Sequence, residues 1–101
     1  MRKEKIPAIY IMANPTYTTL YVSVSSDLIK RVYEHKSGVQ KKSFTTKFNC
    51  HMLVYYEVFE TMVQAITREK QIKAGSRAAK DALIISMNPT WKDLYEEICH
   101  W

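Results

Sequence analysis

The chain has 101 residues, a formal net charge of +5 and 47% hydrophobic residues, which fits one globular domain with a modest core. An aromatic content of 12%, with only two glycines and three prolines, excludes a disordered chain. Two cysteines are too few to build a disulfide scaffold.

The first uncharged run of the chain predicts two strands rather than a membrane helix. No charge occurs between Lys5 and Asp27, but the centre of this run is the polar, turn-forming segment 14–19. Residues 6–13 and 20–24 are rich in Ile, Val and Tyr and predict the two strands of a hairpin. The charged start is similar to that of a signal peptide but lacks a small-residue cleavage site. We therefore expect a cytoplasmic protein with reduced cysteines and no membrane segment.

The rest of the chain predicts one more strand and four helices. In order, the pattern indicates a helix over 28–36, a basic irregular loop over 39–51, a strand over 53–59, and helices over 62–74, 77–87 and 90–98. Capping residues precede these helices (Asp27, Thr61, Ser76, Thr90). Gly38 and Gly75 end the first two helices. The order ββαβααα predicts an α+β fold, in which helices flank a three-stranded antiparallel sheet.

Positive charge is concentrated in the middle of the chain. Residues 28–80 hold eleven basic and four acidic side chains, a net charge of +7, whereas residues 81–101 have a net charge of −3. A basic middle section favours a polyanionic partner such as nucleic acid. An ordinary solvated surface is the alternative interpretation of the same charges.

The helix over 62–74 places a carboxylate among apolar residues. At about 100° per residue, Glu69 falls in the middle of the stripe formed by Met62, Ala65, Ile66 and Ile72. A carboxylate that faces a core needs a cation, hydrogen-bond donors or a metal, because a stranded charge costs several kcal/mol. Lys73, one turn further on, is the local candidate. A structural ion pair and a functional carboxylate are both consistent with this pattern.

The first helix carries two residues suited to phosphate chemistry. Arg31 and His35 are four residues apart and share a helix face. Arginine offers a planar fork of donors to a phosphate, and histidine can carry a proton near neutral pH. The alternative is that both simply line a basic helix surface with Lys30 and Lys36.

The hairpin brings two phenols to one face of the sheet. A turn at Pro15-Thr16 pairs Tyr10 with Tyr21, and Leu20, Val22 and Val24 then take the other face. A register slip by one residue would separate the tyrosines. The alternative interpretation is an ordinary aromatic cross-strand pair.

These residues, in this order, resemble the GIY-YIG endonuclease domain. Its two name-giving tripeptides correspond to Ala8-Ile9-Tyr10 and Tyr21-Val22-Ser23. Arg31 and His35 match its catalytic helix, and Glu69 matches its metal-binding glutamate. The segment from Asn88 to Tyr95 is similar to the closing element of small stand-alone bacterial members.

The resemblance covers about residues 6–98, which implies a single nuclease domain over 1–101 with its core in that range. Two usual glycines are replaced, by Ala8 and Ser23. Ala8 adds one methyl group, whereas a side chain at 23 obstructs the close backbone approach that glycine allows. Val24 replaces a lysine that some relatives carry. Because the tyrosines, Arg31, His35 and Glu69 remain, we expect the chemistry to be retained, with reduced activity as the alternative.

The resemblance implies metal-dependent hydrolysis of DNA phosphodiester bonds, in repair or recombination, with RNA left open as substrate. Glu69 would bind Mg²⁺ or Mn²⁺, and Arg31 would hold the phosphate. Tyr10 would position or deprotonate the attacking water, aided by Tyr21 or His35, and Asn88 would support the site. Five lysines would hold backbone phosphates (Lys30, Lys41, Lys42, Lys47, Lys73).

Two other functions compete with the nuclease hypothesis. A nucleic-acid-binding module without catalysis is suggested by Ser23, and a structural protein would have an inert ion pair at Glu69. The repeated pair Cys50-His51 and Cys99-His100 is similar to a zinc site, but adjacent ligands in an extended chain point apart. We therefore expect no zinc.

Overall fold

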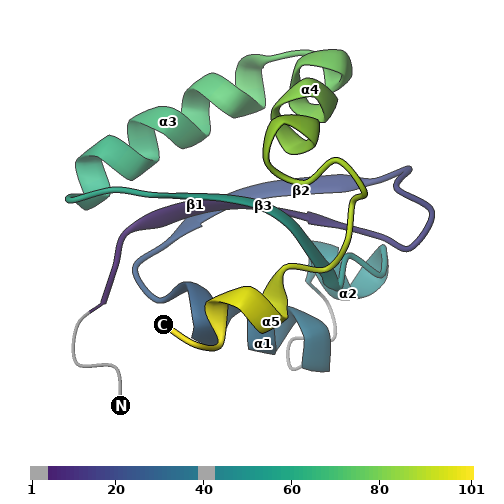
Figure 1. Cartoon of the computed structure of the whole chain (residues 1–101), viewed down its shortest axis with the longest axis horizontal. Coiled ribbons are helices and arrows are strands. Elements are labelled where there is room, and N and C mark those ends of the chain that lie inside the picture. The colour runs from purple at the N-terminus through teal and green to yellow at the C-terminus, as the bar shows by residue number, and fades with distance from the viewer. Residues whose placement is uncertain (1–4, 39–42) are drawn as a thin grey trace.

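The computed structural model describes residues 5–38 and 43–101 and forms an α+β domain. Its sheet has three antiparallel strands, as the sequence predicted, and their order in the sheet is β2-β1-β3. Helices cover both faces of the sheet (Figure 1). The elements in chain order are β1 (Ala8–Ala13), β2 (Leu20–Ser25), α1 (Leu28–Ser37), α2 (Phe44–Lys47), β3 (Met52–Val58), α3 (Met62–Ala74), α4 (Arg77–Met87) and α5 (Tyr95–Ile98).

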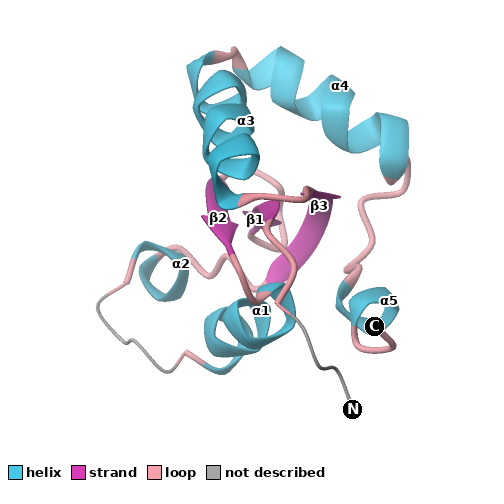
Figure 2. Cartoon of the chain, turned by 90° about the vertical axis from the view of Figure 1, so that its left-hand side faces the viewer, coloured by secondary structure: helices cyan, strands magenta, loops and turns pink. Residues whose placement is uncertain are grey.

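The central strand β1 is fully buried, and its alternating side chains enter two cores. On one face, Tyr10 and Met12 pack with residues of α1 and α5. On the other face, Ile9 and Ile11 pack with residues of α3 and α4. Figure 2 shows the sheet between these two helical layers. The sheet therefore separates whatever α1 carries from whatever α3 carries, except at its edges.

The predicted hairpin register is wrong by two residues. Tyr10 pairs with Ser23, and Tyr21 pairs with Met12. The turn is longer than expected because the Asn14 side chain closes it: its Oδ1 accepts from the Thr19 backbone N–H at 3.0 Å. A shift of two preserves the alternation of faces, so both tyrosines still lie on the same side of the sheet.

The predicted helix ends are largely confirmed, with two corrections. Asp27, Thr61 and Ser76 cap their helices with side-chain oxygens. The first correction is that the loop over 39–51 contains the short helix α2. The second is that the last helix begins at Tyr95 instead of after Thr90, because the intervening chain turns through Trp91 at a φ of 56°.

No helix within residues 5–38 and 43–101 is long and apolar enough to cross a bilayer.

Candidate active site

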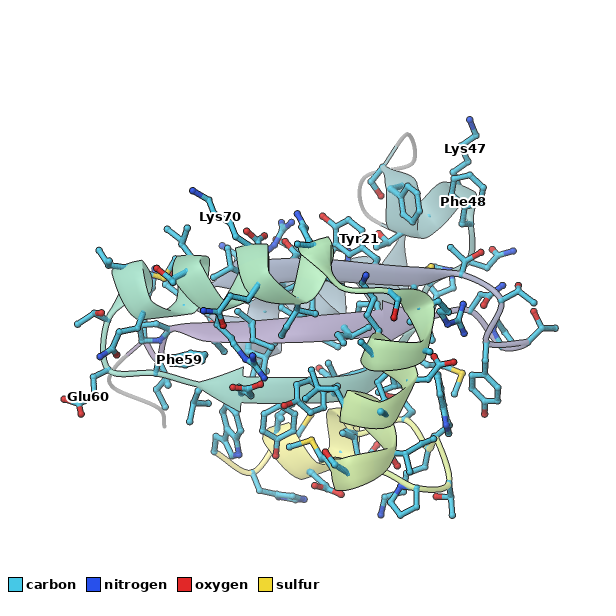
Figure 3. All side chains as sticks on the ribbon, turned by 90° about the horizontal axis from the view of Figure 1, so that it is seen from above. Tyr21, Lys47, Phe48, Phe59, Glu60 and Lys70 are labelled. Carbon is cyan, nitrogen blue, oxygen red and sulfur yellow. The ribbon has the colours of Figure 1, made fainter. Side chains whose placement is uncertain are left out.

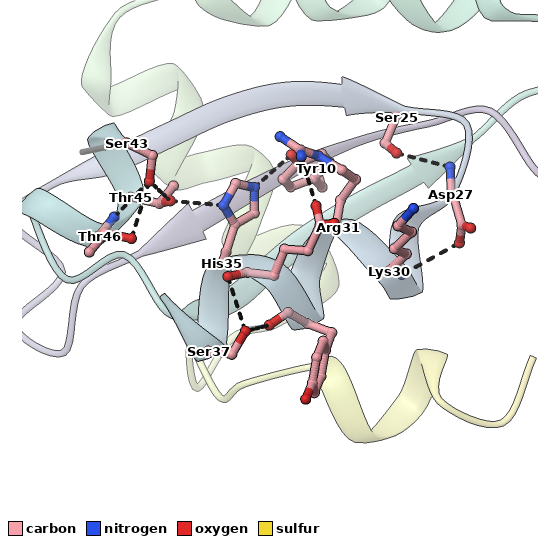
Figure 4. Close-up of polar contacts among 12 residues, drawn as sticks. Tyr10, Ser25, Asp27, Lys30, Arg31, His35, Ser37, Ser43, Thr45 and Thr46 are labelled. Carbon is pink, nitrogen blue, oxygen red and sulfur yellow. Dashed lines mark hydrogen bonds and ion pairs between the residues drawn. The ribbon is translucent and has the colours of Figure 1, made fainter. Parts of the chain in front are cut away.

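Strand β1 and helix α1 bring Tyr10 and His35 into a buried hydrogen bond. The Tyr10 hydroxyl lies 2.9 Å from His35 Nε2 (Figure 4). Tyr10 is fully buried, and His35 is 6% exposed. Two residues that the sequence assigned to catalysis from different elements therefore form one unit.

The second ring nitrogen of His35 is held by a residue that the sequence reasoning missed. His35 Nδ1 lies 2.8 Å from the Thr45 hydroxyl on α2, and Thr45 is itself buried (Figure 4). Ser43 caps α2 and so places Thr45 on its first turn. The Ser43-x-x-Thr46 capping pattern was the signal available in the sequence, but it fell inside a segment expected to be irregular.

His35 is neutral at physiological pH. Burial is the main cause, and the positive charge of Arg31 adds to it, so that the pKa of His35 falls to about 4. A neutral imidazole has one N–H donor and one acceptor nitrogen. His35 can therefore accept a proton at one nitrogen while it donates from the other.

Burial raises the pKa of the Tyr10 phenol above its usual value. A hydrogen bond to Ser23 and the charge of Arg31 act in the opposite direction but are smaller effects. The sequence led us to expect that nearby cations lower the pKa of this phenol. Arg31 does act in that direction, but burial outweighs it, so Tyr10 is protonated at neutral pH.

Arg31 lies beside Tyr10 with its guanidinium partly exposed. Its Nη1 donates to Glu34 Oε1 at 2.8 Å, within the same helix. Such half-exposed pairs are worth only about 0.2–1 kcal/mol, so a phosphate can displace the carboxylate. Glu34 was also missed by the sequence reasoning, although its spacing from Arg31 is typical of a helix ion pair.

Tyr21 lies next to His35 rather than opposite Tyr10. Its ring contacts the His35 imidazole edge-on at a centroid distance of 5.6 Å and stacks on Phe44 of α2 at 5.5 Å. Tyr21 therefore forms one wall of the cluster around His35 and links it to α2.

Glu69 lies on α3, in the helical layer on the other side of the sheet from α1. It is on the flank of α3 that faces the β2 edge. Ala65 and Ile72 point into the core, and Arg68 reaches across to Glu57 of β3 with Nε 3.1 Å from Oε2. At about 100° per residue, Glu69 lies on the other side of that buried line from Arg68. In Figure 3, Tyr21 and Lys70, the residue after Glu69, extend past the same edge of the sheet.

The local ion pair predicted for Glu69 is present. Lys73 Nζ lies 3.3 Å from Glu69 Oε2, and the Glu69 side chain is only 14% exposed. This contact is with Lys73 rather than with Tyr10, Arg31 or His35, so the structure does not join Glu69 directly to the cluster. A functional role for Glu69 stays a prediction.

Asn88 lies apart from the cluster. It is 2% exposed at the end of α4, and its amide nitrogen donates to the backbone oxygens of Val54 (3.1 Å) and Lys92 (2.8 Å). Its side-chain oxygen accepts from the Lys92 backbone N–H at 3.1 Å. Val54 belongs to β3, on the opposite side of β1 from β2. Asn88 thus anchors a loop, and its predicted role in the site has no contact with Tyr10 or His35.

The predicted phosphate-binding lysines differ in their surroundings. Lys30 is exposed on α1, Lys73 is paired with Glu69, and Lys47 lies over the Phe48 ring at 5.8 Å. Lys41 and Lys42 lie outside the described residues. Lys70, exposed on α3, is a further basic residue at the β2 edge that the sequence analysis did not assign (Figure 3).

Glu69 fits a magnesium-type site better than a dense metal cluster. Within the described part of the chain, no group of three or more His, Cys, Asp or Glu side chains could hold a metal. Mg²⁺ commonly takes only one or two carboxylates and completes its shell with waters and phosphate oxygens. A shielded carboxylate paired with one exposed lysine is compatible with that chemistry.

Comparison with known proteins gives one family. The sequence model of the GIY-YIG catalytic domain matches residues 6–82. A UPF0213 protein of Staphylococcus saprophyticus is 38% identical over 66 residues, which cover 65% of this chain and 79% of that protein. A UPF0213 protein of Syntrophus aciditrophicus is 37% identical over 71 residues, which cover 70% of this chain and 80% of that protein. No solved structure matches significantly.

Proposed function

The chain belongs to the GIY-YIG catalytic domain family, and from this premise we propose that it is a metal-dependent endonuclease acting on DNA. The family implies phosphodiester hydrolysis of nucleic acid with a divalent metal. We also propose that the functional domain extends beyond the matched range to about residue 98. Leu94 and Ile98 support this extent, because both are buried in the same core as Tyr10.

The observation that carries the proposal is the hydrogen-bonded chain of Tyr10, His35 and Thr45. As water attacks the phosphorus, its proton passes to the Tyr10 oxygen while the Tyr10 proton passes to His35 Nε2. This tautomer requires the His35 Nδ1–H to donate to Thr45. The new bond joins the water oxygen to phosphorus, the bond from phosphorus to the 3′ oxygen breaks, and solvent protonates the leaving oxygen. A neutral His35 makes such a transfer feasible without a prior deprotonation step.

Two further residues act on the charge of the phosphate. Arg31 exchanges Glu34 for a phosphate oxygen and stabilises the additional negative charge of the transition state. Glu69 would hold Mg²⁺ or Mn²⁺, and the metal would supply positive charge that stabilises the phosphate and the leaving oxygen. Tyr21 shapes the wall of the site beside His35.

The substrate that we propose is DNA, held by its phosphates rather than by its base sequence. Lysines on α1, α2 and α3 (Lys30, Lys47, Lys70) are exposed and can contact phosphates, which carry no sequence information. The more specific proposal is cleavage of flaps, gaps or damaged duplexes, in repair or recombination, in the cytoplasm. RNA is tested as the competing substrate.

A binding module with weakened catalysis is the second candidate. Ser23 favours it, because its side chain lies directly across from Tyr10, at a position where the family usually has glycine. This function predicts salt-sensitive binding to DNA without cleavage and without an effect of chelator.

The decisive experiment is a panel of labelled flap, nicked, duplex and single-stranded DNA and matching RNA. Each substrate is incubated with Mg²⁺, with Mn²⁺ or with chelator. Wild-type protein is compared with Glu69→Gln and with the charge-matched control Glu60→Gln, a change at an exposed site. We expect metal-dependent cleavage by the wild type and the control, with a loss of at least about 100-fold in Glu69→Gln. Equal cleavage by both variants, or none by the wild type, would overturn the nuclease proposal.

A further inference from the structure

Aromatic rings continue outward from the candidate site to the surface. Beyond His35 and Tyr21, the Phe44 ring stacks on Tyr21, and the centroid of the Phe48 ring lies 4.6 Å from that of Phe44. The inner end of this path is buried and its outer rings are exposed: His35 is 6% exposed, Phe44 43% and Phe48 42%. We call Tyr21, Phe44 and Phe48 the aromatic ladder.

The outer part of the ladder is more exposed than packing requires. Phe44 begins α2 and Phe48 caps its end, so the two rings sit four residues apart on one side of a single helical turn. Single exposed apolar residues are common, but adjacent exposed aromatic rings next to a catalytic cluster mark a binding surface. The inner face of α2 already has its own buried contact, which is Thr45 on His35.

The charge around the ladder favours a nucleic acid over an apolar protein partner. Lys47 lies over the Phe48 ring at 5.8 Å, and Figure 3 shows both side chains beyond the sheet edge where Tyr21 and Lys70 extend. Aromatic rings interleaved with lysines are the combination that binds single strands: the rings stack on bases, and the lysines neutralise phosphates. A purely apolar partner would gain nothing from these ammonium groups.

We propose that the aromatic ladder stacks an unpaired DNA base of the strand whose phosphate occupies the candidate active site. The proposal rests on the endonuclease function and specifies its substrate: DNA with single-stranded character next to the cleaved bond. The ladder starts at Tyr21, which contacts the same His35 that bonds Tyr10. A base stacked on the exposed rings of the ladder would belong to the strand whose phosphate Arg31 holds, whereas a fully paired base, whose faces are covered in the duplex, gains no such contact.

The test measures binding without cleavage, in the presence of chelator. Fluorescence anisotropy gives the affinity for a labelled single strand, the same strand with abasic positions, a blunt duplex and the matching RNA strand. The wild type is compared with Phe44→Leu/Phe48→Leu, which retains apolar bulk but has no ring faces. Tyr33→Leu is the matched control, since Tyr33 is an aromatic residue 59% exposed on α1. Circular dichroism and thermal unfolding establish that each variant is folded.

We expect the double variant to bind the single strand at least about 5-fold more weakly than the wild type, with little change for the duplex. The wild type should bind the abasic strand as weakly as the variant binds the normal strand. Equal binding by the double variant, or full binding of the abasic strand, would overturn the ladder proposal, and so would a preference for duplex. Tighter binding to RNA would reassign the stacked base from DNA to RNA and overturn the DNA assignment.

The binding measurements and the metal-dependent cleavage panel together separate this proposal from the nuclease proposal. Ring-dependent binding by a protein that never cleaves leaves the ladder in place and removes the catalytic function. Metal-dependent cleavage by a protein whose binding does not depend on the rings supports the catalytic function and removes the ladder.

Discussion

Ser23 lies directly across the β1–β2 pairing from Tyr10, and its hydroxyl is a hydrogen-bond partner that lowers the pKa of the Tyr10 phenol. Burial acts in the opposite direction and is the larger effect, so the phenol keeps its proton. The residue that departs from the usual family glycine is therefore in contact with the proposed proton acceptor. By favouring the deprotonated phenol, Ser23 acts in the direction that the proposed proton transfer requires.

We predict that Ser23→Ala lowers the cleavage rate about 5-fold, because a neutral hydrogen bond to the developing phenolate contributes about 1 kcal/mol. Ser23→Gly should lose the same amount, since it also lacks the hydroxyl. Single-turnover cleavage at saturating protein measures the effect, with Ser86→Ala, an exposed change on α4, as the control. A Ser23→Gly variant faster than the wild type would contradict this prediction and favour the weakened-module function.

Thr45 provides a second prediction, on the orientation of His35. Thr45→Val removes the hydroxyl that meets Nδ1, so the imidazole loses the partner that fixes its tautomer. We expect kcat to fall about 10-fold with KM unchanged, because the loss affects proton transfer and not substrate contacts.

Thr45→Ser should restore most of the lost activity, since it returns the hydroxyl. Thr67→Val, which makes the same chemical change at an exposed position of α3, should behave as the wild type. A rise in KM without a change in kcat, or a failure of Thr45→Ser to restore activity, would show that Thr45 acts on substrate binding or packing alone.

The sequence predicted most of the fold because its local signals agree with the final packing. Three helices begin at capping residues that are recognisable in the sequence, namely Asp27, Thr61 and Ser76. The alternation of side chains along residues 8–13 places Tyr10 on the face that α1 covers. What failed depends on contacts distant in sequence or on turn detail. The hairpin register follows from the Asn14 side chain, which a tight turn at residues 15–16 would not use.

The residues of the candidate site could be proposed from the sequence, but the contacts between them could not. Tyr10 and His35 could be named, but their hydrogen bond depends on how α1 packs under β1. Thr45 was missed because a four-residue helix leaves almost no periodic signal, and the Ser43 cap alone did not distinguish α2 from an irregular loop. Asn88 was assigned to the site by resemblance, whereas its hydrogen bonds go to β3 and the loop after α4.

Asn88 gives a third prediction, which separates stability from activity. Asn88→Ala removes three hydrogen bonds and leaves the buried Val54 carbonyl and the partly buried backbone groups of Lys92 without their partner. We expect a loss of about 2–4 kcal/mol in the free energy of unfolding, measured by denaturant titration.

The cleavage rate per folded Asn88→Ala molecule should stay within about 3-fold of the wild type, because the residue has no contact with the Tyr10 cluster. Gln71→Ala, an exposed amide on α3, serves as the control for loss of an amide side chain. A stable Asn88→Ala protein with little activity would instead return Asn88 to the catalytic site.

The fourth prediction concerns pH and follows from His35. Its pKa is about 4 in the folded chain and 6.5 in the unfolded chain, so between these values the unfolded state binds a proton that the folded state does not. Stability from this residue is therefore fully present above about pH 6.5, falls as the pH drops, and levels off below about pH 4. The total loss should be up to about 3 kcal/mol. Denaturant unfolding at about pH 7 and about pH 4.5 measures most of it.

The histidine variants isolate this effect from the carboxylates that titrate nearby. His35→Asn should lose less stability than the wild type between the two pH values, even if it is less stable at both. His100→Asn, which changes an exposed histidine, should keep the wild-type dependence on pH. Parallel losses in the wild type and His35→Asn would mean that folding does not lower the pKa of His35, which contradicts this prediction. A smaller loss in the wild type than in His35→Asn would mean that folding raises this pKa, and a charged imidazole could not accept the Tyr10 proton on the proposed route from the attacking water.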